Sequence, residues 1–229
     1  MPFFWYDQYY LFLVVPAALI ALWAQIKVKT TFNKYSGYHA ARGYTAAMVA
    51  RQILDENGLQ NVRIEHICGN LSDHFDPRSN VIRLSDSVYN STSVASIGVA
   101  AHEVGHAIQY AKNYAPIKFR AALIPITQLG SSIAIPLAIF GFAIRMDWLM
   151  TFGILLFSAV VLFQLITLPV EFNASARAIK TLETDMILDE IELQGAKKVL
   201  TAAALTYVAA LLVAIANLVR LLLLRNRDD

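Results

Sequence analysis

His102, Glu103 and His106 form the pattern H-E-x-x-H near the middle of the chain. Side chains four residues apart lie on the same face of a helix, one turn apart, so both imidazoles can bind one metal ion. A glutamate beside the first histidine leans toward the same side and can hold a water molecule on that ion. The spacing therefore predicts the site of a zinc metallopeptidase, with two histidine ligands and Glu103 as general base.

The sequence around the motif favours a mostly buried helix that begins near residues 91–93. The flanking residues are apolar and compatible with a helix: Val99, Ala100, Ala101, Val104, Ala107 and Ile108. A polar cluster buried on such a helix is costly unless a partner satisfies it. This context favours a metal site over a chance match to a short pattern.

A third zinc ligand has to come from elsewhere in the chain. The metzincin extension of the motif needs a glycine and a further histidine, and this chain has Gln109 and Lys112 there. The other common solution is a glutamate on a later helix, and Glu171 directly follows a hydrophobic segment. A downstream acidic run is more typical of a solvated helix face, although its members stay rival ligands: Glu183, Asp185, Asp189, Glu190 and Glu192.

The composition indicates a membrane protein. The chain has 229 residues, 57% of them hydrophobic, and a mean hydropathy of +0.49, which is too apolar for an ordinary soluble domain. Four segments reach the length of about 20 residues that crosses a bilayer, near 9–26, 121–144, 148–170 and 199–224. Pro125, Gly130 and Pro136 are expected to kink the second segment.

We expect a mainly α membrane protein with about four transmembrane helices and a small α+β, zincin-like catalytic domain. Residues 1–26 form the first transmembrane helix, 27–120 the catalytic domain, 121–170 two transmembrane helices, 171–198 a helix with the glutamate ligand, and 199–229 the last transmembrane helix and a tail. Inside the catalytic domain the patterns predict a helix over 46–57, a strand over 61–67, and a hairpin of 71–75 with 81–84.

The distribution of basic residues predicts the orientation in the membrane. Fifteen of the 19 lysines and arginines fall within 27–120 and 171–198. The positive-inside rule then places the catalytic domain in the cytoplasm and both ends of the chain outside. The basic pair Arg225 and Arg227 argues mildly against this and leaves open a fourth segment that does not fully cross. We expect no nucleic-acid partner, because the chain has no basic block.

Four stretches of the chain resemble the YugP family of bacterial membrane neutral zinc metallopeptidases. They are residues 73–78, 81–85, 100–109 and 169–175, and the resemblance extends over essentially the whole length. The last stretch is also similar to the glutamate helix of HtpX-like membrane proteases, E-(F/Y)-x-A-D, with Ser175 in place of the aspartate. The resemblance implies a gluzincin of the bacterial plasma membrane, with Glu171 as the third zinc ligand and Ser175 as a possible partner of a zinc histidine.

The expected reaction is hydrolysis of protein or peptide substrates at or near the bilayer. The Zn²⁺ ion lowers the pKa of its water toward about 7, and Glu103 takes the proton and passes it to the leaving amine. The oxyanion needs a second electrophile. Four candidates stay open: His74, Asn173, Arg177 and Tyr207. The hairpin strand near 71–75 is expected to offer a free edge to an extended substrate.

Two other interpretations compete with a zinc metallopeptidase that acts beside the membrane. An intramembrane protease of the site-2 type would carry the motif inside a span, but the stretch 89–93 before the motif helix is polar, and no Asp-Gly pair follows in the later spans. A catalytically silent membrane scaffold with a structural zinc is the other reading. Structural sites usually have four protein ligands, and a silent site has no need of Glu103.

Overall fold

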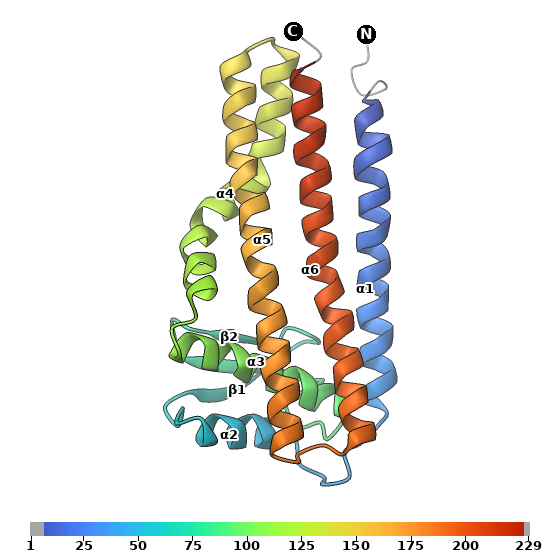
Figure 1. Cartoon of the computed structure of the whole chain (residues 1–229), viewed down its shortest axis with the longest axis vertical. Helices are drawn as coiled ribbons and strands as arrows, with labels where there is room; N and C mark the ends of the chain where they lie inside the picture. Colours follow the sequence, from blue (N-terminus) through green and yellow to red (C-terminus); the bar gives the residue numbers. More distant parts are fainter. Residues whose placement is uncertain (1–6, 227–229) are drawn as a thin grey trace. The chain divides into compact units, whose positions relative to one another are not determined.

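The computed structural model describes residues 7–226, with the backbone alone at Leu129. The chain divides into two compact units. Unit 1 comprises residues 7–25, 118–168 and 205–226 of this range, and unit 2 comprises 26–117 and 169–204. Figure 1 shows the order of the elements along the chain. Arg227 of the basic tail lies outside the described residues, as do the aromatic residues Trp5 and Tyr6 before the first hydrophobic segment.

Among the described residues, 7–226, three helices are long and apolar enough to cross a membrane. The first is α1 (Val15–Ser36) with the π-helical stretch Tyr10–Val14 before it, and the others are α5 (Asp147–Thr184) and α6 (Glu190–Arg225). The helix α4 (Ala115–Ala143) adds a fourth span if its two halves are counted together. The prediction of a mainly helical membrane protein with about four spans is confirmed.

Helix α4 is bent by 48° between Ala115–Gln128 and Gly130–Ala143. It contains Pro125 and Pro136, and each proline removes a backbone donor from the helix. Gly130 lies at the bend, where an added Cβ would come within 3.1 Å of Val160. The kink expected from these residues is therefore present.

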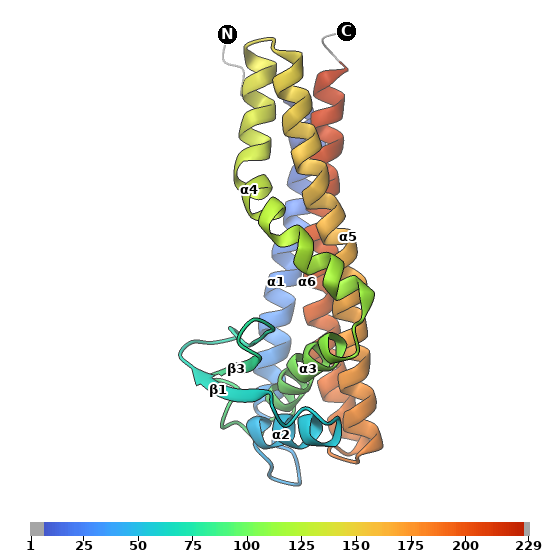
Figure 2. The ribbon, with the colours of Figure 1, turned by 90° about the vertical axis from the view of Figure 1, so that its left-hand side faces the viewer.

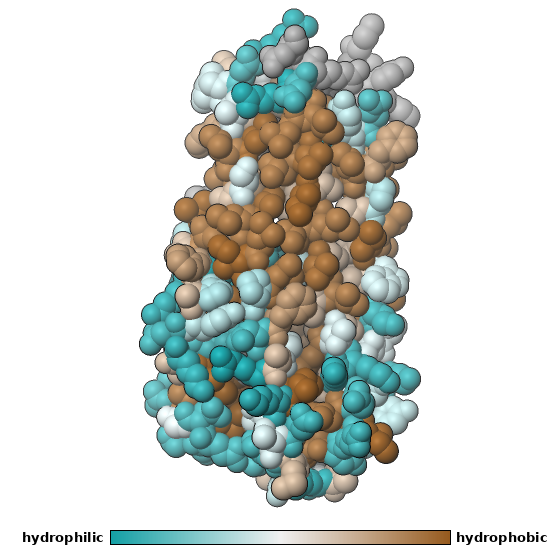
Figure 3. All heavy atoms as spheres, in the orientation of Figure 1, coloured by the Kyte–Doolittle hydropathy of each residue, from teal (hydrophilic) through white to brown (hydrophobic). Residues whose placement is uncertain are grey.

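Unit 1 is held together by apolar packing and has an apolar surface. Its core includes Ala134 and Ala138 of α4, Ile154 and Phe157 of α5, and Leu221 of α6. On the face shown in Figure 3, hydrophobic atoms cover most of this unit. Large apolar side chains are exposed on several of its helices, among them Leu11, Phe12, Trp23, Phe140, Phe152, Leu155 and Leu212. Such a surface is stable against lipid tails and costly in water.

The catalytic-domain elements predicted from the sequence are present in unit 2. Helix α2 (Ala46–Glu56) begins after Thr45, whose side chain accepts a hydrogen bond from Met48 N, and ends before Gly58 with its positive φ of 74°. Helix α3 (Val94–Ala111) carries the H-E-x-x-H motif and is capped by Ser93. Figure 2 shows α2 and α3 beside the strands of this unit.

A three-stranded mixed sheet lies next to α3. It comprises β1 (Arg63–Ile67), β2 (His74–Asp76) and β3 (Val81–Ser85), in the order β1-β3-β2. The predicted hairpin is confirmed, since β2 pairs antiparallel with β3 and Asp76 Oδ1 accepts a hydrogen bond from Arg78 N in the turn. Strand β1 pairs parallel with β3. The short strand β2 is therefore an edge strand, with one side unpaired by any strand of the described chain.

Helix α5 continues through Glu171 to Thr184 instead of ending at the predicted third span. Pro169 is accommodated inside it. The next break comes at residues 185–189, after which Asp189 and Glu192 cap α6 reciprocally, each carboxylate accepting a hydrogen bond from the other residue's backbone amide. The glutamate expected on a separate helix after the span thus belongs to the same long helix as the span.

Candidate metal centre

His102 and His106 lie one turn apart on α3 and point their Nε2 atoms at each other. These two atoms are 3.1 Å apart, and the rings meet edge to face with centroids 4.7 Å apart. Both side chains are largely buried in unit 2. Because a helix holds residues i and i+4 on one face, the local fold of α3 alone creates this pair.

Glu171 brings a carboxylate to the two imidazoles from α5. Its Oε2 atom lies 3.3 Å from His102 Nε2 and 3.6 Å from His106 Nε2, and the side chain is 2% exposed. Within residues 7–226, this is the one group of three or more histidine, cysteine or acidic side chains whose ligand atoms lie within 4.8 Å of one another. The preference for Glu171 over the acidic run therefore agrees with the geometry.

The donor set and its spacing fit a zinc ion. Two imidazole nitrogens and one carboxylate oxygen are the ligands of many catalytic zinc sites. Bonds of about 2.0–2.1 Å in a tetrahedron place neighbouring ligand atoms about 3.3 Å apart, and the three distances between His102, His106 and Glu171 are 3.1, 3.3 and 3.6 Å. The residues present can therefore hold zinc with little rearrangement.

A close contact between α3 and α5 makes this convergence possible. Gly105 lies between the two histidines in sequence, and a Cβ added to it would be 2.7 Å from the carbonyl oxygen of Ala174. Real Cβ atoms do not approach a backbone oxygen that closely. Glycine at 105 therefore allows α5 to pack directly on the face of α3 that carries the histidines.

The Nδ1 atoms of the two histidines also have partners. His102 Nδ1 lies 3.1 Å from Ser175 Oγ, so the serine that replaces the aspartate of the HtpX-like pattern does contact a histidine of the cluster. His106 Nδ1 lies 3.0 Å from Gln109 Oε1. The sequence reasoning missed Gln109 as a partner, although an amide three residues after a histidine on a buried helix is a signal that could have found it.

The charges around His106 favour its protonated form when no metal is bound. Burial by itself lowers the pKa of His106, but the hydrogen bond to Glu171 and the charges of Glu103 and Glu171 raise it. The net effect is a pKa above the ordinary value for histidine. A site that stabilises positive charge in this way also suits a cation.

Glu103 faces the edge strand of the sheet. Its Oε2 atom accepts a hydrogen bond from the backbone amide of Phe75 at 3.0 Å, and its side chain is 8% exposed. The Phe75 ring packs edge to face on Tyr110 of α3, with centroids 6.1 Å apart. Because Phe75 N donates to Glu103, it points away from β3. The predicted general base therefore lies against the unpaired edge of β2.

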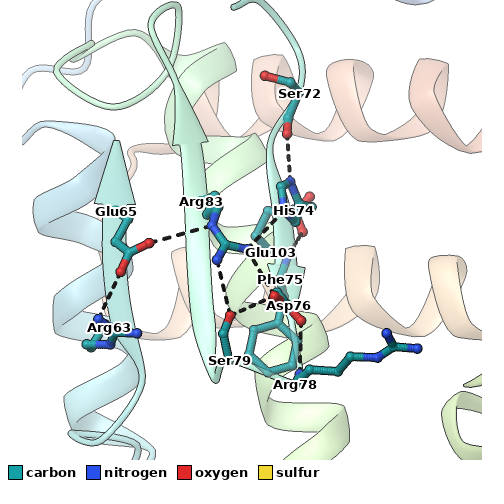
Figure 4. Close-up of polar contacts among 10 residues, drawn as sticks. All are labelled: Arg63, Glu65, Ser72, His74, Phe75, Asp76, Arg78, Ser79, Arg83 and Glu103. Atoms are coloured by element: carbon teal, nitrogen blue, oxygen red, sulfur yellow. Dashed lines mark hydrogen bonds and ion pairs between the residues drawn. The ribbon is translucent and has the colours of Figure 1, made fainter. Parts of the chain in front are cut away.

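Figure 4 shows the surroundings of His74, one of the oxyanion candidates. His74 lies on β2 opposite Arg83 of β3, and its Nδ1 donates to Ser72 O at 2.8 Å. Arg83 also binds Asp76 at 3.0 Å and Glu65 at 3.5 Å. His74 therefore belongs to a charged network on the face of the sheet that does not carry Phe75.

The other oxyanion candidates lie in different surroundings. Asn173 Oδ1 accepts hydrogen bonds from Gln109 Nε2 at 3.0 Å and from Arg177 Nε at 2.8 Å, so these three residues form one network beside the metal cluster. Tyr207 belongs to unit 1. The acidic rivals for zinc are placed elsewhere: Glu183 is exposed, and Asp189 and Glu192 cap α6.

The comparisons with known proteins agree with this centre. A family model described as "Putative neutral zinc metallopeptidase" matches residues 10–226. The chain is 46% identical to the "Putative membrane protease YugP" of Bacillus subtilis (strain 168) over 222 residues, which cover 96% of this chain and 99% of that protein. No solved structure matches the chain. Because the family model spans both histidines, Glu171 and nearly all of the described residues, the chain belongs to this family of neutral zinc metallopeptidases.

Proposed function

We propose that the chain is a membrane zinc endopeptidase that hydrolyses peptide bonds of protein substrates at or near the bilayer. The observation that carries this proposal is the convergence of His102, His106 and Glu171 within 4.8 Å, with Glu103 next to them and hydrogen-bonded to a free strand edge. A ligand set, a base and a place for an extended peptide thus meet at one site.

His102, His106 and Glu171 would hold the zinc ion. When bound, zinc supplies Lewis-acid polarisation of the scissile carbonyl and makes water a nucleophile at neutral pH. Ser175 and Gln109 support the two imidazoles from their Nδ1 sides. Such supporting contacts orient histidine ligands and raise their basicity.

Glu103 acts as the general base and then as the acid for the leaving amine. It is not one of the three ligands, and its carboxylate is fixed at 3.0 Å from Phe75 N. A positioned base of this kind typically contributes about a hundred- to ten-thousand-fold in rate. A glutamate so placed favours a peptidase over a silent structural zinc site, which has no use for a base.

The edge of β2 binds the substrate as an added strand. β2 pairs with β3 on one side alone, and an extended peptide that adds to the other side would replace Glu103 as the acceptor of the Phe75 amide. Recognition through backbone groups places little demand on side-chain sequence. We therefore expect cleavage of unfolded or flexible segments.

We retain His74, which adjoins Phe75 in the sequence, as the candidate electrophile for the oxyanion. We assign Asn173 and Arg177 to supporting the ligand helices.

Unit 2, the catalytic unit with the metal centre, faces the cytoplasm of a bacterial cell. The excess of lysine and arginine in 27–120 and 171–198 favours this orientation. The motif helix α3 is not among the helices of residues 7–226 that pass as candidate spans. This favours hydrolysis beside the membrane over the site-2 type of reaction within it.

Removal and return of the metal tests the proposal. The full chain in detergent is treated with a chelator, and cleavage of an unfolded protein is measured before treatment, after it, and after zinc is restored. We expect cleavage to stop and to return with zinc. Cleavage that survives complete metal removal would contradict the proposal, and a zinc-loaded chain that cleaves nothing would favour the scaffold reading.

A further inference from the structure

Gln109 is a fully buried amide that joins the metal centre to α5. Its exposed fraction is 0%, and its side chain makes three hydrogen bonds. The Oε1 atom faces His106 Nδ1 at 3.0 Å, while Nε2 donates to Val170 O at 2.8 Å and to Asn173 Oδ1 at 3.0 Å. A buried polar group with every contact satisfied in this way defines a single arrangement of its neighbours.

The contacts to α5 fix which end of the amide faces the histidine. The carbonyl oxygen of Val170 only accepts hydrogen bonds, so the NH2 group of Gln109 must point toward α5. Asn173 Oδ1 is held in the accepting role by Arg177 Nε at 2.8 Å. The oxygen of Gln109 is therefore left for His106.

This orientation fixes the tautomer of His106. An amide oxygen accepts and never donates, so Nδ1 of His106 must carry the proton. When His106 is neutral, as a metal ligand must be, its Nε2 atom then presents a lone pair toward Glu171 and His102. His102 differs, because the Ser175 hydroxyl can donate or accept and so imposes no tautomer.

We propose that Gln109 is a positioning residue for the zinc centre, which holds His106 in its Nδ1–H tautomer and aims Nε2 at the metal through a hydrogen-bond chain from Arg177 and Asn173. This inference rests on the proposed function for its chemistry. It concerns zinc binding itself, so it is tested without reference to peptide cleavage.

The first test replaces Gln109 by methionine, which has a similar length and no hydrogen-bonding amide. Zinc affinity is measured by competition with a chromophoric chelator, and the visible spectrum of the Co²⁺-substituted protein reports ligand geometry. We expect Gln109→Met to bind zinc about 10- to 100-fold more weakly than wild type and to change the Co²⁺ spectrum. The exposed residue Gln194 provides the matched control, and Gln194→Met should leave both readouts unchanged.

A second variant separates the tautomer from simple packing. Gln109→Glu keeps an acceptor for His106 Nδ1 but loses both donors to α5. We expect the metal-free Gln109→Glu protein to unfold at a lower temperature than wild type, while its zinc affinity stays within a few-fold and its Co²⁺ spectrum resembles that of wild type. This pattern would show that the acceptor, and not the contact with α5, governs the metal.

Two results would overturn the inference. One is an unchanged zinc affinity and Co²⁺ spectrum in Gln109→Met. The other is an equal loss of zinc in Gln109→Met and Gln109→Glu. Neither result says whether the wild-type chain cleaves peptides. A wild-type chain that binds zinc but cleaves no peptide would contradict the proposed function and leave the inference about Gln109 intact.

Discussion

The backbone amide of Phe75 and the carboxylate of Glu103 are joined by a hydrogen bond of 3.0 Å. Phe75 lies on the edge strand β2 and Glu103 lies on α3, so this bond ties the sheet to the motif helix at the point where a substrate strand would add. The position of the base therefore depends on the edge strand. A peptide that pairs with β2 at Phe75 would take the place of Glu103 on this amide and release the carboxylate to act as the base.

Glu171 should be required for zinc binding. Glu171→Ala removes one of the three converging ligand atoms, so the purified protein should retain far less zinc than wild type. Glu183 is an exposed glutamate on the same helix and serves as the control. Metal content after dialysis measures both variants. Full zinc in Glu171→Ala with loss in Glu183→Ala would assign the ligand to the acidic run instead.

Gly105→Ala should damage the metal centre through packing alone. The new methyl group would lie 2.7 Å from the carbonyl oxygen of Ala174, so α3 and α5 must separate. We expect a loss of about 1–3 kcal/mol in stability, typical of overpacking, together with weaker zinc binding. Thermal unfolding with and without zinc measures both effects.

Gly98→Ala is the matched control for that variant. Gly98 lies on the same helix, and its added Cβ would meet Ala196 Cβ at 3.3 Å, a contact that needs a shift of only a few tenths of an ångström. Its effect on zinc binding should be small. Equal zinc loss in the two variants would mean that helix α3, and not its contact with Ala174, is what each alanine disturbs.

The sequence predicted the features that depend on local spacing. The histidine pair follows from the period of a helix, the start of α3 from the polar stretch 91–93, and the β2–β3 hairpin from the turn residues 76–80. Each of these features is determined by residues that lie close together in the sequence, and the structure contains all of them.

Features that depend on distant segments were not predictable in the same way. The parallel pairing of β1 with β3 joins residues that share no turn, and nothing in strand 61–67 indicates its partner. The length of α5 was also missed. We expected a boundary at Glu171, where the hydrophobic run ends, but the loss of hydrophobicity does not end a helix whose backbone bonds continue. The partners of Asn173 and Arg177 depend on the packing of α5 on α3.

Asp76 should stabilise the fold at neutral pH and lose this effect in acid. Hydrogen bonds from the Ser79 hydroxyl, Arg83 and the Arg78 amide hold the pKa of Asp76 well below its ordinary value. Its ionised form is favoured in the folded state, so the stabilisation is present above the unfolded pKa of about 3.9 and disappears as pH falls through the folded value. Asp76→Asn should therefore lower the unfolding temperature at pH 7, with a smaller difference below pH 4.

Asp55→Asn is the control for the pH experiment. Asp55 pairs with Arg51 on the exposed side of α2, and surface pairs of this kind contribute little. The unfolding temperature of the Asp55→Asn protein should therefore stay close to that of wild type. A difference for Asp76→Asn that is constant between pH 7 and pH 3 would contradict the electrostatic explanation.

The orientation in the membrane can be read from the native cysteine. Cys68 is exposed and lies in unit 2, so a membrane-impermeant thiol reagent should label it only after the cells are opened. Asp147→Cys in a Cys68→Ser background probes the start of α5, and it should react in intact cells. The opposite pattern of labelling would place the catalytic unit outside.

Glu103→Gln tests the central claim most directly. Glutamine keeps the size of the side chain but cannot take a proton, so the variant should fold and bind zinc like wild type. The measurement compares zinc content and cleavage of an unfolded protein for both forms in detergent. We predict equal zinc and a rate lower by about a hundred- to ten-thousand-fold in Glu103→Gln. Equal cleavage by the two zinc-loaded proteins would contradict a peptidase mechanism based on Glu103.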